Sequence, residues 1–299
     1  MKTRIPGELI LLLTAIIWGY GFVAVANSLD NLTAFQLVLL RFGIAAIILI
    51  VVFQKNFRKL KASSLKKGSV LGVLFFIGFS LQTFGIQYTT PSKNAFLTGV
   101  NVIFVPVIAF FLFKRKLTRQ EVFGAVLSLI GIGILTLRTD GQVNVGDLLT
   151  LGCAVAFAFH IFFTTLFMER ESAIDIAIVQ TLTCAILAGI AVLIEGAPMI
   201  TPDRTSLISV LYLAIFSTML TTVFQAHGQK TTSETRSAIL LYTESLWGTF
   251  FSFLFLGEAM TLRLIIGVLI VFSAILLAQI KPKSKSIIKN DLKINKVKS

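Results

Sequence analysis

The sequence has little charge for its length. Only 14% of its 299 residues are charged, whereas a soluble domain has about 25%. Hydrophobic residues make up 56% of the chain, and its mean hydropathy is +0.88. Because so few charges cannot cover so much apolar surface, the composition excludes an ordinary soluble fold.

Cysteine and histidine are also scarce, with two of each. Cys153 and Cys184 lie in apolar stretches without metal-ligand spacing, and we interpret them as small core residues. The sequence has neither the spacing of a nucleophile and its base nor a glycine-rich nucleotide loop. It therefore predicts no metal, no cofactor, no enzyme active site and no ATP-driven motor.

Long apolar runs are abundant. Stretches of about 20 residues, the length of a membrane-crossing helix, recur along the chain. The first follows Lys2 and Arg4 but lacks a cleavage site before a soluble domain, so we interpret it as a span and not as a signal peptide. We predict an all-α polytopic membrane protein with ten transmembrane helices, at residues 8–27, 33–53, 67–87, 92–113, 119–138, 146–168, 174–195, 205–227, 233–256 and 261–280.

Lysine and arginine are concentrated in alternate connections. They crowd residues 54–67, 114–119 and 281–299, whereas residues 28–32 have none. The positive-inside rule then predicts that both termini lie in the cytoplasm, in a multi-pass protein of the plasma (inner) membrane. The net charge of +13 thus reports topology and not nucleic-acid binding. Residues 281–299 are expected to be a disordered basic cytoplasmic tail.

The chain repeats itself with an offset of about 140 residues, the length of five spans. Residues Ile86–Phe113 align with Gly228–Phe255. Because each unit has an odd number of spans, the second unit enters the membrane upside down. We therefore predict two inverted five-helix repeats, residues 1–140 and 141–280, with a binding site near the midplane between them.

An ordered set of segments carries a family resemblance. The set comprises WGYGF at Trp18–Phe22, FQLVLLRFGIAAIIL with Arg41, TTPSKNAFLTGVNVIFVPVIAF and YTESLWGTFFSFLFLGEAMT. In these segments the chain resembles the drug/metabolite transporter superfamily, of the EamA type. The resemblance implies ten helices in two inverted repeats, a central cavity and transport of small metabolites, often the export of amino acids. Ser245 departs from the family pattern, which often has proline after the glutamate, and so does the basic end of the fourth span.

These observations lead to an expected function. We expect a secondary transporter that exports a small metabolite, an amino acid or a related amphipathic compound, by alternating access. Nutrient uptake or facilitated diffusion is an alternative, and a lipid flippase or integral membrane enzyme is an alternative of another class. The expected partners are the small-molecule substrate and the lipid bilayer. The substrate, the direction, proton coupling and the choice between monomer and homodimer stay open.

Glu244 is an isolated carboxylate in an apolar stretch. A charge at a helix centre costs about 2.5–3.5 kcal/mol in the membrane, so Glu244 should face the bundle interior, as a transport site or a packing contact. Arg41 could pair with it, or could snorkel or cap a helix. The candidate cavity residues are Trp18, Tyr20, Arg41, Gln82, Thr98, Asn101, His160, Gln225, Tyr242, Glu244 and Trp247. For the aromatic residues and His160, ordinary packing is the competing interpretation.

Overall fold

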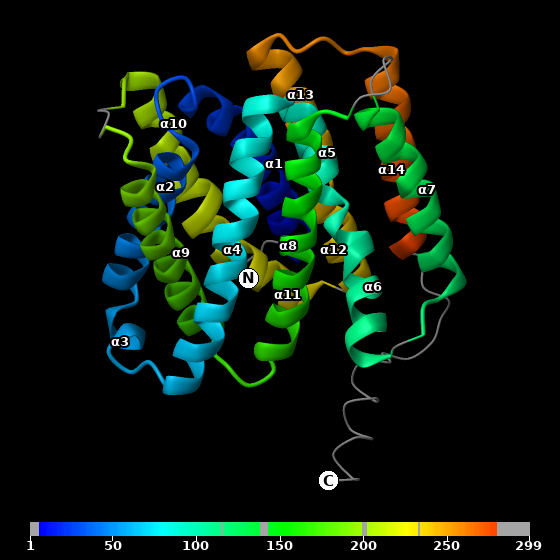
Figure 1. Ribbon diagram of the computed structural model, residues 1–299. Coiled ribbons are helices and arrows are strands. Elements are labelled where there is room, and N and C mark those ends of the chain that lie inside the picture. Colours follow the sequence, from blue (N-terminus) through cyan, green and yellow to red (C-terminus); the bar gives the residue numbers. More distant parts are fainter. Residues whose placement is uncertain (1–5, 115, 138–142, 199–201, 233, 280–299) are drawn as a thin grey trace, which may run out of the picture.

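The computed structural model describes residues 6–114, 116–137, 143–198, 202–232 and 234–279. These residues form a bundle of helices (Figure 1). Ten helical segments are long and apolar enough to cross a membrane, which confirms the all-α polytopic fold. The predicted tail at 281–299 lies outside the described residues.

The first half of the chain supplies five spans. They are α1 (Gly7–Ser28), α2 (Ala34–Val52), α4 (Ala62–Tyr88), the pair α5 (Pro91–Gly99) and α6 (Asn101–Phe113), and α7 (Arg119–Thr136), with the short α3 (Gln54–Phe57) after α2. The third span begins at Ala62 and not near residue 67, because its helix continues beyond the apolar stretch into polar residues. Thr90 caps α5 and Pro91 occupies its first turn, which together set the start of the fourth span.

The second half supplies the other five spans. They are α8 (Val145–Phe167), α9 (Ala173–Glu195), a composite of α10 (Arg204–Ala214), the π-helical segment η1 (Ile215–Leu220) and α11 (Thr221–Thr231), the pair α12 (Glu234–Tyr242) and α13 (Glu244–Leu256), and α14 (Leu262–Gln279). The sequence predicted the eighth span as one regular helix. The structure instead has a π-helical segment at its centre, a feature that is frequent at functional sites.

The fourth and ninth spans are also interrupted, although the sequence predicted each as continuous. The amide of Val100 bonds to the carbonyl of Leu97 at 3.3 Å, and that of Thr243 bonds to Leu240 at 3.2 Å. Both bonds reach three residues back instead of four, which tightens the helix locally. Pro106 removes a further backbone donor in α6. Each interruption separates a pair of half-span helices.

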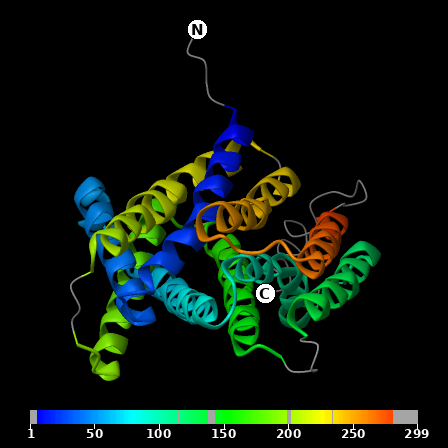
Figure 2. The same cartoon turned by 90° about the horizontal axis from the view of Figure 1, so that it is seen from above.

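Helices of the two halves pack mainly on one another. α4 lies against α8 and α9, α2 against α9 and α10, α1 against α10, α11 and α13, and α7 against α14. Seen from above, the α7–α14 pair forms one edge of the bundle, and α2, α9 and α10 form another (Figure 2). The interrupted spans lie between these edges, with α13 against α1 and α5, and with α5 and α6 against α8.

The two ends of the bundle differ in charge. The lower end in Figure 1, which we call the basic end, carries Lys55, Arg58 and Lys59 in the connection from α2 to α4. The upper end, which we call the acidic end, carries Asp30 after α1 and Glu258 after α13. This asymmetry follows the distribution of lysine and arginine among the connections.

Candidate functional site

Arg41 is held inside the bundle by neutral groups. Only 6% of its surface is exposed. Its Nε donates to Thr218 Oγ1 at 2.9 Å, and a terminal nitrogen donates to Ser217 Oγ at 3.3 Å. The guanidinium also lies 4.4 Å from the centroid of the Phe79 ring, in a cation–π contact. A permanent positive charge therefore lies among hydroxyls and an aromatic face.

The structure bears on the alternatives given for Arg41. Arg41 and Glu244 do not form an ion pair with each other, and neither takes part in the ion pairs Lys67–Glu171 and Lys93–Asp147 of the described residues. Arg41 does not snorkel either, since it is buried and bonded to η1. The physical reason is local: η1 presents two adjacent hydroxyls, those of Ser217 and Thr218, within reach of α2.

A side chain of α1 also donates a hydrogen bond to the π-helical segment. The indole Nε1 of Trp18 donates to the carbonyl of Ser217 at 3.1 Å and to Thr221 Oγ1 at 3.0 Å. Thus η1 connects α1 and α2 through Trp18 and Arg41. Ser217 and Thr218 were not among the residues predicted from the sequence, although hydroxyl residues in the middle of an apolar span were an available signal.

A second polar network joins α4, α5 and α8. Gln82 Nε2 donates to Thr98 Oγ1 at 3.3 Å, so the structure brings these two predicted residues together. Asn94 donates to Thr150 Oγ1 at 2.7 Å and to the carbonyl of Gln82 at 3.1 Å. Gln82 follows Phe79 by three residues, nearly one turn of α4, so this network adjoins the aromatic face beneath Arg41. Asn94 and Thr150 were not among the residues predicted from the sequence.

The two interrupted spans meet at the centre of the bundle. Gly99, directly before the interruption in the fourth span, lies so close to the Tyr242 ring that a Cβ would overlap it. Tyr242 itself directly precedes the interruption in the ninth span. Ser245 Oγ donates to the carbonyl of Ala95 at 3.0 Å, which holds α13 against α5. Both interruptions are therefore in direct contact.

Each interruption is followed by a polar side chain. Asn101 is the first residue of α6, and Glu244 is the first residue of α13. Both are partly exposed, and neither forms a hydrogen bond or ion pair with the described residues. At both interruptions the backbone stays in the right-handed helical region, and the carbonyls of Val100 and Thr243 accept hydrogen bonds from the amides three and four residues further on.

The remaining predicted residues have packing partners or lie apart. His160 Nε2 lies 3.0 Å from Gln180 Oε1, and its ring stacks on Phe75, so it is a structural contact between α8, α9 and α4. Tyr20 packs edge-on against Phe251, and Trp247 stacks on the same ring. Tyr242 stacks on Phe272, and Gln225 is partly exposed in α11.

Charged contacts link the halves at the ends of the bundle. At the acidic end, Lys93 Nζ lies 3.5 Å from the Asp147 carboxylate, which also accepts a hydrogen bond from Thr89. At the basic end, Glu171 accepts from Lys67 at 2.7 Å and from Ser64 at 2.6 Å. These hydrogen bonds, led by that from Lys67, lower the pKa of Glu171 to about 2.

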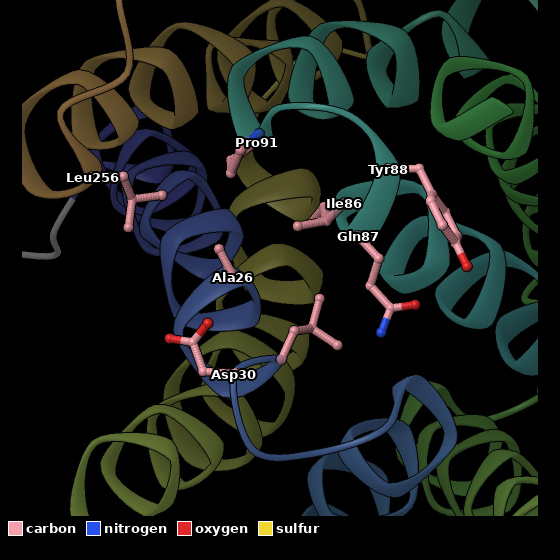
Figure 3. Close-up of a pocket in the computed structure, with 8 residues that line it drawn as sticks. Ala26, Asp30, Ile86, Gln87, Tyr88, Pro91 and Leu256 are labelled. Atoms are coloured by element: carbon pink, nitrogen blue, oxygen red, sulfur yellow. The ribbon is translucent and has the colours of Figure 1, made fainter. Parts of the chain in front are cut away.

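A pocket of about 520 Å³ opens at the acidic end, between α1, α4, α5 and α13 (Figure 3). None of the residues predicted from the sequence lines it. We call the networks of Arg41 with η1 and of Gln82 with Thr98, together with the two interruptions, the polar site; none of these residues lines the pocket.

Comparison with known proteins gives related sequences and a related fold. The sequence profile described as EamA-like transporter family matches residues 5–137 and 144–279. An uncharacterized transporter of Archaeoglobus fulgidus is 28% identical over 93% of this chain and 87% of its own length. A probable amino-acid metabolite efflux pump of Salmonella typhimurium is 28% identical over 70% of this chain and 73% of its own length. One crystal structure, 17% identical, covers 91% of this chain and 96% of its own with a TM-score of 0.65, which shows a shared fold.

Proposed function

Because the chain belongs to the EamA-like transporter family, we propose that it is a secondary transporter that exports a small amphipathic metabolite, an amino acid or a related compound. The observation that carries the proposal is the contact between two interrupted spans, each followed by a polar residue without a partner among the described residues. The Salmonella relative named as a probable amino-acid metabolite efflux pump supports this substrate class.

The two halves, residues 1–140 and 141–280, act as inverted repeats in this proposal. The interruptions at Val100 and Thr243 occupy equivalent places, the middle of the fourth span of each half. The third span, α4, runs from the basic to the acidic end, whereas the eighth, from α10 to α11, runs the opposite way (Figure 1). Rocking of one half against the other would expose the central site to each side in turn.

The basic end faces the cytoplasm in this proposal, in accordance with the positive-inside rule. Both chain termini then lie on the cytoplasmic side of the plasma membrane. The acidic end, with its pocket, faces outward. This orientation makes the pocket the exit side for an exported solute.

The charges of the site suit a zwitterion. The guanidinium has five N–H donors, and the bonds to Thr218 and Ser217 leave others for a carboxylate. Glu244 supplies the opposite charge for an ammonium group. Because an ionised group is costly within the membrane region, a ligand group of opposite sign would stabilise the ionised form of each side chain. The aromatic rings of Trp18, which bonds to η1, and of Phe79, which lies under Arg41, add apolar contact for the rest of the molecule.

Metabolite profiling tests the proposal first. Medium from cells with and without the protein is compared, and each enriched compound is then tested for flux in liposomes that contain the purified protein. We expect an amino acid or related compound to accumulate outside and to move down its gradient with no nucleotide added. Strict dependence on ATP, or flux of lipid alone, would contradict it. The variant Glu244→Gln removes the carboxylate of the proposed site. Its control is Glu169→Gln, which makes the same chemical change in an exposed connection.

A further inference from the structure

The pocket at the acidic end has an apolar wall and a polar rim. Its volume of about 520 Å³ falls within the range of about 300–1,000 Å³ typical of small-molecule sites. The wall is formed by Ala26, Leu29, Ile86, Pro91 and Leu256. This composition suits a small molecule that buries an apolar part and leaves a polar part toward water.

The rim carries a negative charge. Asp30, Gln87 and Tyr88 supply its polar groups (Figure 3). Of the described residues that line the pocket, Asp30 alone is charged. A second hollow of about 490 Å³ shares this rim and adds Glu195. The rim therefore favours a cationic group over an anionic one.

Two helix faces lead from the pocket to the polar site. On α1, Trp18, Phe22 and Ala26 are spaced by four residues and so share one face. On α4, Gln82 and Ile86 have the same relation. Ala26 and Ile86 line the pocket, whereas Trp18 and Gln82 belong to the polar networks below. The pocket is therefore above the polar site along both helices.

Apolar side chains close the space between these two levels. Phe22 and Ile86 belong to one buried cluster, and each is 6% exposed. A Cβ added at Gly248 would lie 2.9 Å from the Cβ of Ala95 and 3.1 Å from Cδ2 of Phe22. Phe22 thus fits tightly where α1, α5 and α13 meet.

We propose that the pocket is the outer vestibule of the transport path, and that Phe22 and Ile86 form the gate between it and the polar site. This inference rests on the proposed function and orientation. The vestibule takes a small amphipathic solute with a cationic group, which lies toward Asp30 while its apolar part lies against the wall. Movement of α4 away from α1 opens the gate, while the hydrogen bonds of Ser245 to Ala95 and of Ser92 to Glu258 keep α5 against α13 and its C-terminal end.

Cysteine accessibility tests the vestibule. Both native cysteines are buried, so the wild-type protein gives a low background. Ala26→Cys in intact cells should react with a membrane-impermeant thiosulfonate added outside. A cationic reagent should react roughly tenfold faster than an anionic one, and Asp30→Asn should remove most of this difference. No reaction from outside, or no charge preference, would overturn the vestibule.

Labelling below the gate tests Phe22 and Ile86. Gln82→Cys should react slowly in the otherwise wild-type protein and at least several-fold faster when combined with Ile86→Ala. Ile77→Ala is the matched control, because it makes the same change at an exposed position of the same helix. Equal rates with and without Ile86→Ala would overturn the gate. If the cysteines react as expected but the protein moves no metabolite, the proposed function is contradicted instead. Failure of the gate can therefore be distinguished from failure of the proposed function.

Discussion

Replacing Thr218 with valine keeps the shape of the side chain but removes the hydroxyl that accepts the Arg41 Nε–H bond of 2.9 Å. Arg41 is 6% exposed, so the lost bond cannot be replaced by bulk water. A hydrogen bond to a charged group contributes about 1.5–3 kcal/mol, and the free energy of unfolding should fall by about this amount. Arg41→Met should cost less stability, because it removes the charge that needs the bond.

Unfolding of the purified protein in mixed detergent, followed by tryptophan fluorescence, measures this difference. Thr165→Val is the matched control, since the Thr165 hydroxyl bonds only to its own helix, at the carbonyl of Ile161. We expect the control to change the free energy of unfolding by less than about 0.5 kcal/mol. In liposomes, Arg41→Met should lose flux although it stays folded. If Thr218→Val unfolds like the control, or if Arg41→Met transports like wild type, the role assigned to this bond or to Arg41 is refuted.

Three further predictions concern packing, pH and topology. Gly19→Ala should destabilise the protein by about 1–3 kcal/mol, because its Cβ would lie 2.5 Å from a side chain of α13; Gly43→Ala, where a Cβ meets nothing within 4 Å, should not. Because the pKa of Glu171 is lowered to about 2, its stabilising contribution is complete above its usual pKa of 4.5 and is lost as the pH falls toward 2. Hydrogen exchange of the adjoining connection should rise over that range in wild type but not in Glu171→Gln, and a flat wild-type response would contradict the assignment. A reporter after Lys59 should be cytoplasmic and one after Asp30 external; the reverse result would contradict the orientation.

Hydropathy was sufficient to predict the spans, because each of the ten is a long apolar run. The start of α5 was also predictable, since Thr90 and Pro91 are local signals that act within one turn. From the sequence, Gln82 and Thr98 could be predicted to line the same cavity, but their hydrogen bond to each other could not be predicted. Local signals therefore predicted the helices, but not how each helix is rotated about its own axis relative to its neighbours.

The interruptions at Val100 and Thr243 could not be predicted from their surroundings. Both lie within mainly apolar sequence that continues a helical pattern, so tertiary contact decides the local geometry. Whether Arg41 pairs with Glu244 could not be decided from the sequence for a related reason. Similar depth in two spans does not fix the direction in which each side chain points around the bundle. Contacts of η1 determine the direction of Arg41.

Flux in liposomes tests the central claim most directly, namely that a solute binds beside the two interrupted spans. A metabolite identified by profiling is loaded inside, no nucleotide is added, and efflux is followed for wild type, Glu244→Gln and Glu169→Gln at matched protein density. We expect wild type and Glu169→Gln to release the metabolite at equal rates. Glu244→Gln should lose at least about tenfold in rate, since a lost charge contact of about 1.4 kcal/mol corresponds to that factor. Equal efflux by all three proteins would contradict a transport site at Glu244.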